Sequence, residues 1–167
     1  MEMKQITLSL LVDNNPGVLS RIAGLNSRRN YNIETISAGS TQDERFTRIT
    51  VLVSGDDRIL EQIRCQIEKL EEVRKIVVLE DKTSVCRELL LVKVMAGKRE
   101  KQDLIAIADV FRAKIVDVST ETLMMELTGS QNKLDAFLNL LSDYEIVELV
   151  RTGITGLSRG LDVLSLS

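Results

Sequence analysis

The stretch VSGDDRILEQI at residues 53–63 has a counterpart in LTGSQNKLDAF at residues 127–137. Each stretch begins with an apolar residue, continues with a small hydroxyl residue and a glycine, and places a leucine at Leu60 or Leu134. Asp56 and Ser130 stand just before the apolar spacing of a helix, where a side-chain oxygen can accept a hydrogen bond from the first helical turn. The two stretches therefore predict equivalent strand-to-helix junctions in two copies of one unit.

Apolar periodicity extends this unit in both directions from residues 53–63. Alternation predicts strands at residues 6–12, 32–37, 46–53 and 73–79. Helical spacing predicts one helix from Val18, Ile22 and Leu25 and another from Leu60, Ile63, Ile67 and Leu70. The order is strand, helix, strand, strand, helix, strand.

The same order recurs in the second half of the chain. Strands are predicted at residues 89–95, 114–119, 122–127 and 145–150, and helices from Leu104, Ile107, Ala108 and Phe111 and from Leu134, Phe137, Leu138 and Leu141. We therefore expect an α+β protein of two tandem ferredoxin-like domains, at residues 1–81 and 85–160. The tail at residues 161–167 follows no such pattern, and disorder is one interpretation of it.

One face of the first predicted sheet has a mixed composition. It carries Thr7, Ser9 and Leu11 on one strand and Arg48, Thr50 and Leu52 on another. These residues are too polar for a core and too apolar for full exposure. Pairing with a second copy would cover them, so we expect at least a dimer.

The composition excludes the commonest catalytic sites. The chain has no histidine, which rules out Ser-His-Asp and Cys-His sites and histidine-bearing metal sites. Neither GxGxxG nor GxxxxGK[ST] occurs, and the adjacent acid pairs at residues 56–57 and 71–72 are typical of a solvated surface. We predict no catalytic residue and no metal ligand.

Charge and hydropathy limit the partners and the compartment. A net charge of −3, with three Phe, two Tyr and no Trp, argues against nucleic acid as a partner. No apolar run of about 18 residues and no leader is seen, so we expect no membrane span and a cytoplasmic protein. Cys65 and Cys86 are interpreted as reduced thiols, because they lie outside any C-x-x-C spacing.

The chain's only proline lies in DNNPGVLSRIAGL, residues 13–25, between the first strand and the first helix. Asn15 suits the helix cap, Pro16 suits the first helical position, and Gly17 would let a ligand approach the backbone. The amides near Gly17 could then bind the carboxylate of a small amino acid, and the side chain of Asn14 offers a donor and an acceptor for its two charged groups. The alternative is a capped helix without a ligand. The equivalent turn, MAGKREKQDL at residues 95–104, has neither proline nor asparagine, which favours a ligand in the first half.

The segment NNPGVLSRIAGLNSRRNYNIETISAG at residues 14–39 resembles the start of an ACT domain, an amino-acid-sensing module. Over residues 4–160 the chain resembles the regulatory (small) subunits of acetohydroxyacid synthase, also called acetolactate synthase. That resemblance also rests on LEQIRCQIEKLEEVRKIVVL (60–79), RELLLVKV (87–94), FRAKIVDVS (111–119), KLDAFL (133–138) and RTGITGLSRG (151–160). Asn30 replaces the family's usual glycine, and asparagine is the next best residue for a left-handed position after a helix.

The resemblance implies a non-catalytic chain that activates a separate catalytic subunit, which would carry thiamine diphosphate, FAD and Mg²⁺. It also implies a homodimer through the ACT domain and feedback inhibition by valine or another branched-chain amino acid. The implied effector residues are Asn14, Asn15, Pro16, Gly17, Val18, Leu19 and Ser20 in the first loop, with Asn32 and Ile33 in the second strand.

Three questions remain open at this point: how the two parts of the effector site meet, which function the chain has, and what RTGITGLSRG does. A first helix of about 13 residues would span ~20 Å, so Asn14 and Asn32 would meet only across a dimer. A stand-alone ACT sensor acting on a transcription or transport partner is the rival function, and an independent enzyme is a weaker third. RTGITGLSRG would dock a partner under the preferred function, or would be a flexible tail.

Overall fold

The computed structural model describes residues 3–25 and 32–164. Asn30, where the sequence departs from the family pattern, lies outside these ranges. The chain forms two compact units, one from residues up to Cys86 together with those from Ile154 on, and one from Arg87–Gly153. Each unit has its own sheet and its own core.

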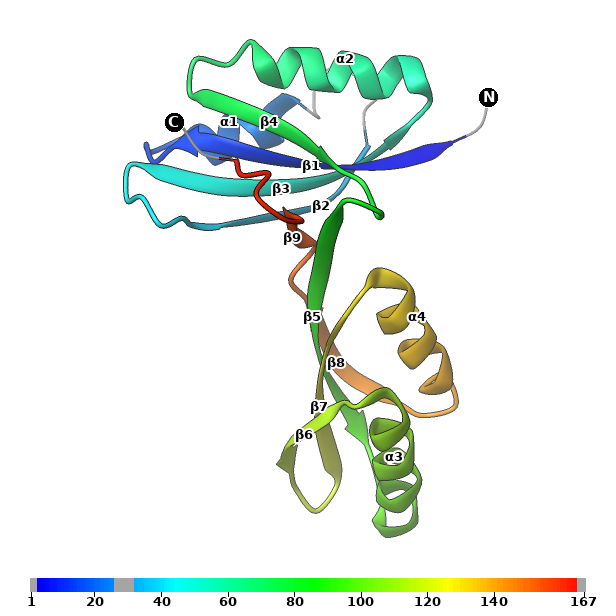
Figure 1. Cartoon of the computed structure of the whole chain (residues 1–167). Helices are drawn as coiled ribbons and strands as arrows, with labels where there is room; N and C mark the ends of the chain where they lie inside the picture. The colour runs from blue at the N-terminus through cyan, green and yellow to red at the C-terminus, as the bar shows by residue number, and fades with distance from the viewer. Residues whose placement is uncertain (1–2, 26–31, 165–167) are drawn as a thin grey trace. The chain divides into compact units, whose positions relative to one another are not determined.

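The first unit is a four-stranded antiparallel sheet with two helices (Figure 1). Its elements are β1 (Lys4–Asp13), α1 (Val18–Gly24), β2 (Asn32–Ser40), β3 (Phe46–Gly55), α2 (Asp57–Glu68) and β4 (Val73–Leu79). The strands lie in the order β2-β3-β1-β4. The predicted order of elements is confirmed.

Both helices of this unit cover the same face of the sheet. The core between them consists of Leu8, Leu10, Val12, Val18, Ile22, Ile49, Val51, Val53, Leu60, Ile63 and Ile67. Asp56 caps α2 as predicted, because its side chain accepts a hydrogen bond of 2.8 Å from the Ile59 amide. Because side chains alternate along the strands and recur every three to four residues along the helices, the apolar residues of both lie in the core between the sheet and the helices.

The second unit repeats this plan. Its elements are β5 (Ser84–Met95) from Arg87 on, α3 (Lys98–Phe111), β6 (Lys114–Val118), β7 (Thr122–Gly129), α4 (Gln131–Leu140) and β8 (Ile146–Arg151). The strand order β6-β7-β5-β8 matches the order in the first sheet. Ser130 caps α4 as predicted, accepting from the Lys133 amide at 3.4 Å.

The C-terminal segment differs from the prediction. We expected the second domain to run to residue 160 and a tail at residues 161–167 to follow, but the chain from Ile154 on belongs to the first unit. The short strand β9 (Thr155–Ser158) pairs with β5, and the Ile154 carbonyl accepts a 2.9 Å hydrogen bond from the Ser37 hydroxyl. Leu164, in the predicted tail, is only 7% exposed.

This segment partly covers the sheet face opposite the helices. β9 lies beside β1 and β4, and Ser9, Leu11 and Thr50 on that face are buried. The chain itself therefore supplies some of the cover that we had expected from a second copy.

Candidate functional site

The turn before α1 is built around Gly17 rather than Asn15. Gly17 is the N-cap residue, with φ of 88°, and no side chain caps this helix. Asn15 instead donates its amide to the Asp13 carbonyl, and Pro16 precedes the helix. The predicted cap at Asn15 and first helical position at Pro16 are wrong, because the left-handed Gly17 turns the chain before the helix begins.

Three backbone amides at the start of α1 have no acceptor within the helix. The first helical hydrogen bond runs from the Arg21 amide to the Gly17 carbonyl at 3.0 Å, so the amides of Val18, Leu19 and Ser20 precede it. The Val18 side chain is buried in the core, whereas Leu19 is 46% exposed and Ser20 is exposed. The turn thus presents backbone donors beside an exposed apolar side chain.

Asn14 joins this turn to the β2–β3 turn. Its amide donates to the Arg45 carbonyl at 2.8 Å, and Nδ2 donates to the Glu44 carbonyl at 3.1 Å. Its Oδ1 accepts from the Thr47 hydroxyl at 3.1 Å. A side-chain amide has two donor hydrogens and two acceptor lone pairs, so Asn14 keeps capacity for one more bond of each kind.

An open hollow of about 660 Å³ lies between these two turns. It is lined by Asp13, Asn14, Asn15, Glu44, Arg45, Phe46 and Arg74. Arg74 binds Asp13 through two hydrogen bonds of 2.7 and 2.5 Å, which lower the pKa of the Asp13 carboxyl. Positively and negatively charged side chains therefore line the hollow beside Asn14.

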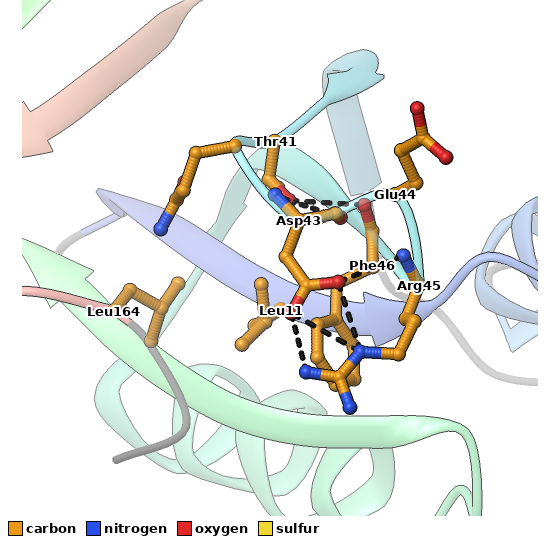
Figure 2. A pocket seen from close by; sticks show the side chains of 8 residues that line it. Leu11, Thr41, Asp43, Glu44, Arg45, Phe46 and Leu164 are labelled. Atoms are coloured by element: carbon orange, nitrogen blue, oxygen red, sulfur yellow. Dashed lines mark hydrogen bonds and ion pairs between the residues drawn. The ribbon is translucent and has the colours of Figure 1, made fainter.

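A second hollow of about 530 Å³ lies on the other side of the β2–β3 turn. Figure 2 shows its lining, with Leu11 and Leu164 facing the ordered turn of residues 41–46. Arg45 binds Asp43 in a two-pronged ion pair, with Nε–Oδ1 at 2.9 Å and Nη2–Oδ2 at 2.6 Å, and its guanidinium lies 5.3 Å from the centre of the Phe46 ring. These bonds lower the pKa of Asp43 to about 2.

The residues that support Asn14 are not evident from the sequence. Glu44, Arg45 and Thr47 lie in or just after the turn between β2 and β3, and Arg74 lies on β4. The sequence showed only a polar turn there, and no periodicity links it to Asn14, some 30 residues away.

Asn32 and Ile33 lie at the opposite end of the sheet from Asn14. Asn32 pairs with Ser54, whereas Asp13 pairs with Phe46, so the two ends are separated by eight positions of β3, or ~26 Å. The Asn32 side chain donates to Glu34, and Ile33 packs against the core. One copy of the chain therefore does not bring the two predicted parts of the effector site together.

Clusters of metal-ligating side chains and disulfides are absent from the described residues. Residues 3–25 and 32–164 contain no group of three or more Cys, Asp or Glu side chains arranged to hold a metal ion. Cys65 and Cys86 are in the thiol form, as predicted, and neither is part of a disulfide. No helix in the described part of the chain is long and apolar enough to cross a membrane.

Two family models match consecutive parts of the chain. Residues 8–75 match the model of the "AHAS small subunit-like ACT domain", and residues 87–160 match that of the "Small subunit of acetolactate synthase". The fold and these matches define a two-unit α+β protein with an ACT domain.

The relatives narrow this class to one family. A probable acetolactate synthase small subunit of Methanothermobacter thermautotrophicus is 47% identical over 161 residues, covering 96% of each chain. The small subunit of Mycolicibacterium smegmatis is 46% identical, over 92% of this chain and 91% of that one. The crystal structure of the small subunit from Thermotoga maritima matches with a TM-score of 0.86 and 38% identity, over 94% of this chain and 98% of that one. The chain belongs to the family of acetolactate synthase small subunits, which implies a catalytic large subunit as its partner.

Proposed function

We propose that the chain binds the catalytic subunit of acetolactate synthase, raises its activity, and lowers that activity again when valine or another branched-chain amino acid is bound. The proposal assigns thiamine diphosphate, FAD and Mg²⁺ to the catalytic subunit. It assigns the chain to the cytoplasm as a homodimer that binds no nucleic acid.

One contrast between the two units carries the proposal. In the second unit, the side chain of Glu100 turns back and accepts a 2.5 Å hydrogen bond from the Gly97 amide at the start of α3. At the start of α1 no side chain caps the helix and the first turn has no acidic residue. An effector carboxylate would occupy at α1 the position that the chain's own carboxylate occupies at α3.

The remaining groups of the loop suit the rest of an amino acid. Asn14 can accept from an ammonium group, and the exposed Leu19 can contact a branched side chain. Asn32 of a second copy would complete the site, since within one copy it lies ~26 Å away.

An activity assay on the purified catalytic subunit tests this proposal. Adding the chain should raise the rate of pyruvate consumption, and adding valine should lower it. The chain alone, supplied with thiamine diphosphate and Mg²⁺, should consume no pyruvate. Valine binding without any effect on the catalytic subunit would favour the rival function, a stand-alone sensor.

A further inference from the structure

Among the described residues, Arg48 on β3 is a half-buried cation that binds no carboxylate. Its guanidinium lies on the sheet face opposite the helices and donates from Nη1 to the Ser9 hydroxyl at 2.8 Å. Among the described arginines, Arg64 and Arg151 are also half-buried, and each binds two carboxylates. Burial without such a partner lowers the pKa of Arg48. A desolvated charge of this kind is costly unless it is paired.

Two unsatisfied hydroxyls lie on the same face. In the described part of the chain, Thr35 and Thr50 have the buried side-chain oxygens without a hydrogen-bond partner. Thr50 pairs with Ser9 and Thr35 with Leu52, so both side chains share the face of Arg48. An unpaired buried hydroxyl typically costs about 1–3 kcal/mol, so polar groups that lack partners are concentrated on this face.

The acids nearest Arg48 are bound to other arginines. Asp13 shares this face by strand alternation and is bound by Arg74. Asp43, in the adjoining turn, is bound by Arg45. Arg48 therefore lacks a carboxylate among the described residues, and the catalytic subunit is the partner that the family implies.

We propose that Arg48 binds an aspartate or glutamate side chain of the catalytic subunit, so that this face of the first sheet is part of the contact between the subunits. The inference rests on the proposed function in one respect, the identity of the partner. A guanidinium offers two parallel donors to a carboxylate, and the Ser9 contact uses one of its five N–H groups.

The test compares Arg48→Met and Arg48→Ala with Arg64→Ala in association with the catalytic subunit, measured by titration calorimetry. Methionine keeps an apolar stem over the strands while removing the charge. Arg64 is the matched control, because it is a half-buried arginine on α2 that is paired within the chain. Both Arg48 variants should weaken association roughly 30-fold or more, and Arg64→Ala should change it by no more than about twofold.

Two further measurements distinguish a loss of the proposed contact from misfolding of the variant and from a loss of self-association. Thermal melting confirms that Arg48→Met is folded, and sedimentation of the isolated chain reports self-association. Wild-type affinity of folded Arg48→Met for the catalytic subunit would overturn the inference. Loss of self-association instead would also overturn it, by assigning the carboxylate to a second copy. Failure of the wild-type chain to associate with the catalytic subunit would contradict the proposed function itself.

Discussion

Gly17 determines how the chain passes from β1 into α1. Its φ of 88° is a left-handed conformation that costs a residue with a Cβ roughly 1 kcal/mol, although an added Cβ would meet no atom within 4 Å. Gly17→Ala should therefore lower the free energy of unfolding by about 1 kcal/mol, measured in urea. The control is Gly24→Ala, an equally open position within α1. Equal stability of the two variants would contradict this account.

Gly17→Asp tests the function of the same residue. Aspartate tolerates left-handed conformations and would bring a carboxylate to the amides at the start of α1. We expect this variant to fold but to lose valine binding and feedback inhibition. If it melts like the wild type and binds valine with unchanged affinity in calorimetry, the loop is only a helix cap.

Asp43 should titrate far below its ordinary pKa. The Arg45 side chain and backbone amide hydrogen-bond to the carboxylate and lower its pKa from 3.8 to about 2. A carboxyl whose pKa is lower in the folded state stabilises the fold above its unfolded pKa, and that contribution is lost as the pH falls toward 2. Following the carboxyl carbon by NMR should give a midpoint near 2 in the wild type, and Arg45→Ala should return it toward 3.8. A midpoint unaffected by this substitution would show that the ion pair does not form in solution.

At the scale of elements, the sequence predicted most of the fold. Alternation located β1, β3 and β4, and the caps Asp56 and Ser130 were read correctly, because each depends on residues close together in the chain. β9 was missed, because four residues that pair with a strand about 70 positions earlier have no local periodicity. The cap of α1 was misassigned because Asn15 and Pro16 have good capping propensity, and only the backbone geometry shows that Gly17 takes that place.

Gly156 allows β9 to approach β5 closely. A Cβ at this position would lie 2.7 Å from the Cys86 sulfur and 2.8 Å from the Val85 carbonyl oxygen, and a backbone atom cannot move aside cheaply. Gly156→Ala should therefore destabilise the chain by about 1–3 kcal/mol in urea unfolding. Gly39→Ala on β2 is the control, because its added Cβ would meet no atom within 4 Å. Equal stability of the two variants would mean that β9 does not pack as described.

At the scale of the whole molecule, the chain contains two similar units with different helix termini. In the second unit, Glu100 accepts from the Gly97 amide at the start of α3, whereas no side chain caps the start of α1 and its first turn has no acidic residue. The sequence alone indicated this asymmetry, because the proline and the asparagine pair occur only in the first half. It could not show that the β2–β3 turn holds Asn14, since that contact depends on the sheet.

Mixed dimers of Asn14→Ala and Asn32→Ala test most directly the claim that two copies share each effector site. Under a two-fold axis, each site takes its loop from one copy and its strand from the other. Each mutant homodimer therefore has two damaged sites. A heterodimer with one substitution per copy has one site with both defects and one site with neither.

The decisive measurement is the number of valine sites in that heterodimer by titration calorimetry. The account predicts one site per dimer of near wild-type affinity, whereas either homodimer binds weakly. A heterodimer that binds valine no better than its parents would contradict the shared site and place the effector within one copy.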